Sequence, residues 1–492
     1  MKRWNHFLLL GMLVLGMWII TGIQAEAAVP VDAVHFPDET IRAYAESMDV
    51  DKNGVLSDIE LQIPTYFSWH TKTSMEEFGA KPGAEVNFKG MEYFINIEVV
   101  SLGDMGVGGE RWNCENCNLL DCFPYAKRMN LTTYGSDGVG EICLSGISNS
   151  IEDIYIYATR IKKWNVKAKN LKKLEMEVSG TLGKDFSLEG APSLQELAIH
   201  GAQLQDTGIS LKGLHSLKFL SLLRTNYRTL DLSPVKKTLK TLSLGDHHES
   251  DDVYNTEGGS RYLRTLDISQ MEKLEEVWAG DMGITKLITR DAAGKAKTKR
   301  LKELYLSECK IKSIDVSAMP RLEKLHLRST SISKLNVTKN KRLQELGISC
   351  TKIKSINLKK NVKLDTLIMG GMKRKIKTLD LSKNTSLRAL YLGQTRIGTL
   401  RYPMLKKSMK WSDYYKSYSS GYGGGSGALS ATVTVVDLSK ITKLTKKTKG
   451  YQLKIERYSG VKKVIMSKKL KKADRKWMKR KIRQAGAKVV VK

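Results

Sequence analysis

The chain has 492 residues, a formal net charge of +31 and only six cysteines. Its length exceeds what one compact globule holds, and the low cysteine count excludes a disulfide-dense scaffold. The excess of positive charge supports non-specific binding to anionic partners without naming one.

The first 27 residues have the pattern of a secretory signal peptide. Lys2 and Arg3 precede a stretch without charge from Phe7 to Ile23, and Ala25-Glu26-Ala27 supplies a cleavage site. An uncleaved membrane anchor is the alternative, although 17 uncharged residues are at the short limit for spanning a bilayer. No later apolar run approaches membrane length. The pattern therefore predicts a protein that is secreted or surface-associated, with no transmembrane segment after cleavage.

Residues 49–60 match the twelve-position EF-hand loop, within a helical N-terminal cap that we place at residues 28–96. Gly54 stands where the loop turns sharply, and Pro64 limits the second helix to about one turn. The first helix is expected from Pro37 to about Met48. The six ligand positions hold Asp49, Asp51, Asn53, Val55 (through its carbonyl), Ser57 and Glu60. This pattern predicts calcium as a cofactor; the alternative is a solvated acidic turn.

One pattern, L-x-x-L-x-L-x-x-T-x-I-x-x-L-D-V-S, then recurs. Its first leucine is Leu301, Leu322, Leu343, Leu364 and Leu387, at spacings of 21, 21, 21 and 23 residues. Weaker copies start at Ile151, Leu171, Leu194, Leu217, Leu239 and Leu274, and two more are indicated at Ile97 and near Met129. A period in the twenties is typical of a leucine-rich-repeat solenoid, here of about thirteen turns over residues 97–440.

The repeat predicts an α/β-type solenoid: a right-handed superhelix with a parallel β-sheet on its concave face. Positions 4 and 6 lie two residues apart, so both side chains point inward from one short strand. Position 9, occupied by Cys309 and Thr330 among others, is expected to satisfy backbone groups where the chain leaves the strand. The Asp and Ser of the D-x-S motif are expected to form turns rather than to act as catalysts. Inserts interrupt the period at residues 246–260, 290–300 and 401–434.

The order of these segments resembles a known family. The motif F-P-D-E-x-x-R-x-Y from Phe36, the calcium-type loop and the segment from Lys89 to Ile97 precede repeats of 21–23 residues. Over about residues 36–400 this resembles the secreted, internalin-like leucine-rich-repeat proteins of Gram-positive, often gut-dwelling bacteria. The resemblance implies a surface adhesin or binding protein, with calcium on the six residues named above. No LPxTG-like sorting signal is present, so covalent wall attachment is not implied.

The outward residue at position 5 of consecutive repeats predicts a contact patch on the concave face. Trp278, Tyr305 and His326 follow one another there, with Glu303 and Arg328 in neighbouring positions. Aromatic side chains flanked by charges are typical of hot spots for proteins and glycans. The alternative is that aromatic residues simply suit strands.

The cysteines and histidines allow weaker interpretations. Cys114, Cys117, Cys122 and Cys143 are candidates for a disulfide, for zinc or for free thiols, and Cys309 and Cys350 are too far apart to pair. The insert with His247 and His248 is more typical of a solvated acidic loop than of a metal site. Catalytic motifs are missing, so we expect no enzyme.

Residues 441–492 are expected to form a basic α/β C-terminal cap. Lys440 to Lys492 hold 21 Lys and Arg against two acids. A helix is predicted at residues 468–485, with Leu470, Ala473, Trp477 and Ile482 facing inward. Two functions follow as hypotheses: adhesion to, or recognition of, a host or bacterial surface protein or glycan through the concave face, or non-specific binding of teichoic acid, polysaccharide or nucleic acid through this cap.

Overall fold

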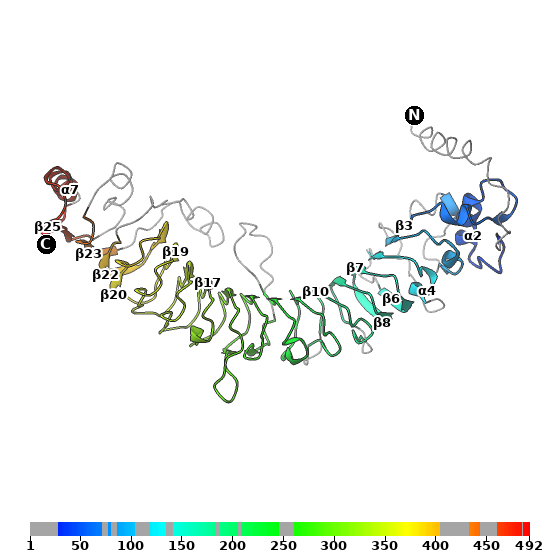
Figure 1. Ribbon diagram of the computed structural model, residues 1–492, viewed down its shortest axis with the longest axis horizontal. Helices are drawn as coiled ribbons and strands as arrows, with labels where there is room; N and C mark the ends of the chain where they lie inside the picture. The colour runs from blue at the N-terminus through cyan, green and yellow to red at the C-terminus, as the bar shows by residue number, and fades with distance from the viewer. Residues whose placement is uncertain are drawn as a thin grey trace.

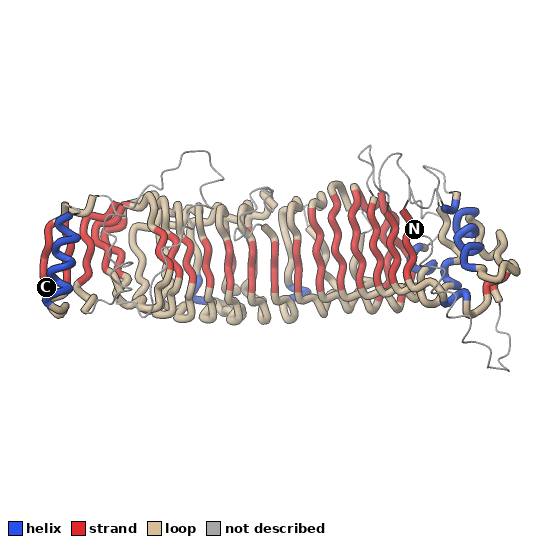
Figure 2. Tube along the Cα trace, turned by 90° about the horizontal axis from the view of Figure 1, so that it is seen from above, coloured by secondary structure: helices blue, strands red, loops and turns tan. Residues whose placement is uncertain are grey.

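The computed structural model describes residues 28–70, 77–79, 86–103, 118–133, 141–182, 186–204, 208–245, 260–403, 432–442, 460–484 and 486–492. These residues form a long curved solenoid, in which one sheet lines the inner side of the curve (Figure 1). Seen from above, the strands stand side by side along the molecule and nearly all helix lies at its two ends (Figure 2). Within the described residues, no helix is long and apolar enough to cross a bilayer.

The inner, concave sheet contains fourteen parallel strands within the described residues. They are β3 (Tyr66–His70), β4 (Val99–Gly103), β5 (Arg128–Thr132), β7 (Asp153–Ala158), β9 (Lys173–Val178), β10 (Glu196–His200), β11 (Phe219–Ser221), β12 (Thr241–Ser243), β14 (Glu276–Trp278), β16 (Glu303–Tyr305), β17 (Lys324–His326), β18 (Glu345–Gly347), β19 (Thr366–Ile368) and β21 (Ala389–Tyr391). The two weakest predicted turns are confirmed as β4 and β5. The sheet begins at β3, inside the segment that the sequence assigns to the N-terminal cap.

The predicted alternation of inward and outward residues is confirmed. Leu301, Leu304 and Leu306 are fully buried, and the same positions are buried in the turns that follow. The leucine pattern did not predict β3, because the inward residues of this strand are Phe67 and Trp69 rather than leucines. Removing this apolar surface from water stabilises each turn by roughly 25 cal/mol per Å², and the turns share one continuous core.

The chain leaves each short strand through a residue with left-handed backbone. Glu308 has φ 65° and Ser329 has φ 59°, and the same repeat position has positive φ at Arg224, Asp281, Cys350 and Gln394. The next side chain then turns inward: Thr330 Oγ1 donates to the Leu327 carbonyl at 2.7 Å, and Thr351 Oγ1 to that of Ile348 at 2.9 Å. The role expected for position 9 is therefore confirmed.

The D-x-S motifs are turns, as predicted. Asp315 Oδ1 accepts the backbone N–H of Ser317 at 2.9 Å, and Asp267 Oδ1 accepts that of Ser269 at 2.8 Å. Asp315 also pairs with Arg290 at 2.8 Å. Both carboxylates therefore accept hydrogen bonds within their own turns.

The outer, convex side carries shorter sheets. β6 (Glu141–Ser148) pairs with β8 (Arg160–Ala168), and β13 (Thr265–Asp267) pairs with β15 (Lys286–Ile288). A third sheet joins β20 (Ile376–Asp380), β22 (Arg396–Arg401), β23 (Thr432–Leu438), β24 (Lys463–Met466) and β25 (Lys488–Val491) in parallel. Four short 3-10 turns lie beside these sheets or in the cap within the described residues: η1 (Glu60–Gln62), η2 (Met91–Tyr93), η3 (Ser233–Val235) and η4 (Val316–Ala318). The C-terminal cap thus continues the convex sheet.

The C-terminal helix α7 (Lys472–Gln484) connects β24 to β25 and stands at the end of the solenoid (Figure 1). The predicted inward face is confirmed in part: Leu470 and Ile482 are buried and Trp477 packs partly against the core. Ala473 is exposed, however, and Asp474 and Met478 are buried instead, so the buried residues of α7 follow an i, i+4 row.

The N-terminal cap packs an aromatic cluster against the first strands. α2 (Glu39–Met48) begins at Asp38, whose carboxylate accepts the Thr40 N–H at 2.9 Å. Tyr44 meets Phe67 edge to face at 5.1 Å, and Trp69 stacks beside Phe67 at 5.9 Å between ring centroids. This cluster closes the open end of the solenoid core.

A row of buried asparagines joins consecutive turns on the convex side. Asn361 Nδ2 donates to the carbonyls of Val337 and Asn340, at 2.9 and 2.8 Å. Asn340 and Asn384 make the equivalent bonds one turn before and one turn after. Each of these three side chains is completely buried, so each carboxamide fastens its turn to the preceding one.

Replacing Asn361 by alanine is expected to destabilise the solenoid by about 1–3 kcal/mol, because two buried carbonyls lose their donor. Denaturant unfolding followed by circular dichroism measures the change. Asn357→Ala is the matched control, since Asn357 is exposed and only caps the Lys359 N–H in the same turn. Equal midpoints for the two variants would contradict a fastening role for Asn361.

Candidate functional site

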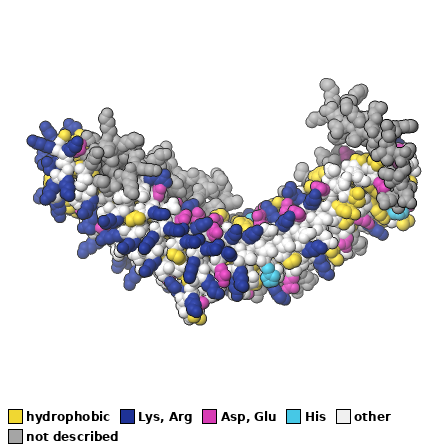
Figure 3. All heavy atoms as spheres, viewed as in Figure 1, with side chains coloured by type: hydrophobic (Ala, Val, Ile, Leu, Met, Phe, Trp, Pro, Cys, Tyr) yellow, Lys and Arg dark blue, Asp and Glu magenta, His cyan; other side chains and the backbone are white. Residues whose placement is uncertain are grey.

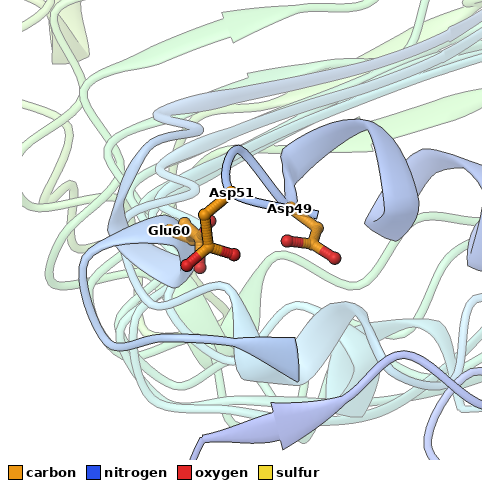
Figure 4. A group of neighbouring side chains, drawn as sticks. All are labelled: Asp49, Asp51 and Glu60. Atoms are coloured by element: carbon orange, nitrogen blue, oxygen red, sulfur yellow. The ribbon is translucent and has the colours of Figure 1, made fainter. Parts of the chain in front are cut away.

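The acidic loop predicted from the sequence brings three carboxylates together. Asp49 follows α2 directly, Asp51 lies two residues later, and Glu60 begins the short helix η1 (Glu60–Gln62). One oxygen from each carboxylate lies within 4.8 Å of the others. Figure 4 shows the three carboxylate groups side by side in the loop.

Hydrogen bonds from the loop backbone hold these carboxylates in place. Asp49 Oδ2 accepts the Gly54 N–H at 2.8 Å, and the two oxygens of Glu60 accept the N–H groups of Val50 and Ser57 at 2.7 and 2.9 Å. Burial alone would raise the pKa of Glu60, but the hydrogen bonds from Ser57 and Val50 outweigh it and lower the pKa. Glu60 is therefore an ionised acceptor at neutral pH.

A short strand pair braces the loop from outside. β2 (Val55–Leu56) pairs antiparallel with β1 (Val29–Pro30), and the Val31 N–H donates to the Gly54 carbonyl at 3.0 Å. Leu56 is fully buried. A single loop of this kind has no second copy to pair with, and β1 takes that position here.

On the concave face, the predicted row lies in register. Trp278 is paired with Tyr305, and Tyr305 with His326, on adjacent parallel strands. However, the expectation that this row is exposed is wrong for two of its members. Tyr305 is 4% and His326 is 8% exposed, whereas Trp278 is half-buried.

The burial has a clear geometric cause. The rings of Tyr305 and His326 stack with centroids 4.7 Å apart and planes 14° from parallel. The outward residue of the next strand is Gly347, where a Cβ would lie 2.7 Å from His326 Nδ1. His326 Nε2 also lies 3.2 Å from Glu345 Oε1. The two rings therefore cover each other and leave Trp278 as the accessible aromatic residue of the row.

Charged side chains run beside the aromatic row. Glu303 pairs with Lys324 at 3.3 Å, and Arg328 lies 3.9 Å from Glu308. Burial, and then repulsion from Glu303 and Glu275, raises the pKa of Glu276. In the described part of the chain Glu276 forms no salt bridge, and the positive charges of Lys302 and Lys324 offset this repulsion only in part.

Two open hollows lie toward the N-terminal half of the concave face, and the sequence did not predict them. One, of about 330 Å³, is lined by Tyr155, Tyr157, Glu175, Glu177 and His200 among others. The second, of about 310 Å³, shares Glu175 and His200 and extends to Phe219 and Ser221. His200 Nε2 lies 2.9 Å from Ser221 Oγ. The small residues at position 5, Ala198 and Ser221, are the feature of the sequence from which the second hollow could have been predicted.

The structure describes only some of the cysteines and histidines that the sequence offers as candidate sites. Cys122 lies in the short helix α4 (Leu119–Cys122) and Cys143 in β6, and both are buried. Cys114, Cys117 and the insert with His247 and His248 lie outside the described residues. Cys309 is buried, its Sγ donates to the Ala279 carbonyl at 3.0 Å, and burial raises the pKa of its thiol to about 12.

The basic charge of the C-terminal cap lies on its surface. α7 carries Lys472, Arg475, Lys476, Lys479, Arg480, Lys481 and Arg483, of which all but the half-buried Arg475 are exposed. Its one acid, Asp474, is buried. In Figure 3, Lys and Arg surround this end of the molecule and spread along the visible flank.

Comparison with known proteins places the fold. The family model described as leucine-rich repeats (2 copies) matches residues 299–340. Together with the parallel strands of about thirteen turns, this decides the architecture. The chain is a leucine-rich-repeat solenoid. No curated protein matches the sequence.

Solved structures of similar shape include two from Listeria monocytogenes. The functional domain of InlJ is 15% identical, with a TM-score of 0.46, and the match covers 86% of this chain and 85% of that one. The internalin InlF is 17% identical, with a TM-score of 0.43 and coverage of 76% and 94%. The Toll–Spätzle complex of Drosophila matches at 13% identity and a TM-score of 0.49, over 81% of this chain and 55% of that one.

Proposed function

We propose that this protein is a secreted or surface-associated binding protein that recognises a partner protein through its concave face, in the manner of an adhesin. The observation that carries the proposal is the fourteen-stranded concave sheet, which presents outward side chains in register along one continuous surface. The aliphatic inward residues are buried in the core, where a partner cannot contact them. Recognition is left to the outward positions, among which Trp278 combines a large ring with the neighbouring carboxylate of Glu276.

A second candidate function rests on α7. Seven cationic side chains on thirteen residues form a surface suited to an anionic polymer, such as teichoic acid, a polysaccharide or a nucleic acid. Contacts of this kind weaken steeply with salt. This dependence separates them from recognition through the concave face.

Trp278→Ala is expected to reduce capture of a surface-protein partner at least tenfold, because loss of a central aromatic anchor costs about 2 kcal/mol or more. The measurement is a pull-down from host and bacterial surface extracts by the full chain, at low and at moderate salt. Trp477→Ala on α7, outside the concave sheet, is the aromatic control, and circular dichroism checks that this variant folds because Trp477 packs partly against the core.

The same assay includes the triple variant Lys476→Gln, Lys479→Gln, Arg480→Gln. One outcome would favour binding of an anionic polymer over recognition through the concave face. In that outcome, capture survives Trp278→Ala, is lost in the triple variant and is abolished by moderate salt. Capture that is unchanged in both variants would contradict both functions.

We further propose that residues 49–60 bind one calcium ion that stabilises the N-terminal cap. Asp49, Asp51 and Glu60 would supply carboxylate oxygens, Asn53 and Ser57 side-chain oxygens, and Val55 its carbonyl. Oxygens that share one calcium at about 2.3–2.6 Å lie within about 5 Å of each other. The spacing of at most 4.8 Å between the three carboxylates fits this limit.

Calcium at ten times its dissociation constant should stabilise the full chain by about 1.4 kcal/mol, because only the folded loop binds it. Thermal unfolding in calcium and in a chelator measures the shift. Glu60→Gln should remove the shift, whereas Glu39→Gln, an exposed acid on α2 outside the loop, should keep it. A wild-type melting curve that is identical with and without calcium would contradict the site.

A further inference from the structure

The concave face contains a trough between β9 and β14. At position 5 of the five consecutive strands, the outward residues in register are Glu175, Ala198, Ser221, Ser243 and Trp278. The three in the middle have short side chains and are 9%, 3% and 5% exposed. They form the floor, Glu175 and Trp278 stand at the two ends, and four strand spacings of about 4.8 Å give a length of roughly 19 Å.

The floor carries a polar group without a partner. Ser243 points out of the sheet into the trough and is 95% buried by its neighbours. Within the described residues its hydroxyl makes no hydrogen bond, in contrast to Ser221, which contacts His200 at 2.9 Å. Because Ser243 occupies an outward position of its strand, its hydroxyl is directed into the trough and can bond a ligand lying there. The two hollows described above form its N-terminal end.

The charge of the concave face is opposite to that of the whole chain. The outward strand positions from β5 to β21, with the left-handed residues that follow them, hold nine acids against four bases. The acids are Asp153, Glu175, Glu177, Glu196, Glu276, Asp281, Glu303, Glu308 and Glu345, and the bases are Arg128, Lys173, Arg224 and Lys324. The complete sequence has 82 bases and 51 acids. In Figure 3, acidic and basic side chains stand together along the upper, concave edge, while bases predominate on the flank.

Two of the carboxylates beside the trough form no salt bridge within the described residues, although Lys302 and Lys324 partly offset the charge of Glu276. Glu175 is paired with Lys173 at 3.2 Å and Glu177 with Arg224 at 2.7 Å. Glu196 on β10 and Glu276 on β14 have no ion pair within the described part of the chain, and both occupy position 3 of their strands. Three strand spacings separate them, which corresponds to roughly 14 Å.

We infer that the trough binds an extended segment of the partner protein that carries two basic residues four positions apart. The inference rests on the proposed function and specifies the chemistry of its partner. An extended chain advances about 3.4 Å per residue, so residues i and i+4 lie roughly 14 Å apart and on the same side of the strand. Their side chains meet Glu196 and Glu276, and the Ser243 hydroxyl bonds the backbone between them. Small floor residues leave room for that backbone.

The test uses two fluorescein-labelled peptides and the full chain. Ser-Arg-Ser-Ser-Ser-Arg-Ser has the predicted spacing, and Ser-Arg-Ser-Ser-Arg-Ser-Ser has the same composition with its arginines three apart, on opposite sides of an extended chain. Fluorescence polarisation should show tighter binding of the first. The double variant Glu196→Gln, Glu276→Gln should weaken that binding about three- to tenfold, as expected for two exposed charge pairs.

Two further variants control for charge and for shape. Glu189→Gln with Glu272→Gln removes the same charge from acids that lie off the concave face and pair with Lys212 and Lys297, and it should bind the peptide like the wild type. Ser243→Trp fills the floor without changing charge and should block binding. Equal binding of both peptides, or equal binding by the two double variants, would overturn the inference.

The partner pull-down separates the two proposals. If Trp278→Ala loses the partner while Glu196→Gln, Glu276→Gln retains it, concave recognition stands and the basic segment is excluded. If capture survives protease treatment of the extract but not periodate oxidation, the ligand is a glycan and the inference fails. Loss of capture in both variants, together with discrimination between the peptides, supports both proposals.

Discussion

The structure depends on one constraint: each turn can satisfy its strand backbone only by pairing in register with its two neighbours. The inward residue at position 4 therefore faces the inward residue of the next turn, as Leu304 faces Leu325. The same register aligns the outward residues into rows. It also aligns the polar residues of the turns, so that the asparagine carboxamides at 340, 361 and 384 each reach back to the preceding turn. Core, fastening row and recognition surface are three consequences of one repeat.

The sequence predicted the solenoid because its period is set by backbone pairing and by leucines that have no other role. It also placed the acidic loop and the turn function of the D-x-S motifs. The exposure of the side chains at position 5 was predicted less well, since it depends on the size of the side chain at position 5 of the neighbouring turn. Tyr305 and His326 are buried because they stack on each other and because Gly347 leaves room beside the imidazole. The trough was missed for the same reason: a floor of small residues is visible only when five strands are compared side by side.

The three regions of interest differ in charge, and the roles proposed for them differ accordingly. The loop near the N-terminus concentrates carboxylates around one point, which suits a divalent cation. The concave face is acidic and grooved, and α7 is basic. On a chain of net charge +31, an acidic concave face is a local departure from the average. In the functions we propose, a basic partner segment binds in the trough and an anionic surface binds at α7.

The central claim is that recognition takes place on the outward positions of the concave sheet. Hydroxyl-radical footprinting of the full chain, alone and with its captured partner, tests this most directly because it reads side-chain accessibility. The account predicts protection of Trp278 and of Tyr155 and Tyr157 beside the trough, with unchanged oxidation of Trp477 on α7. Protection confined to α7 or to the convex sheets, with the concave aromatic residues as reactive as in the free protein, would contradict it.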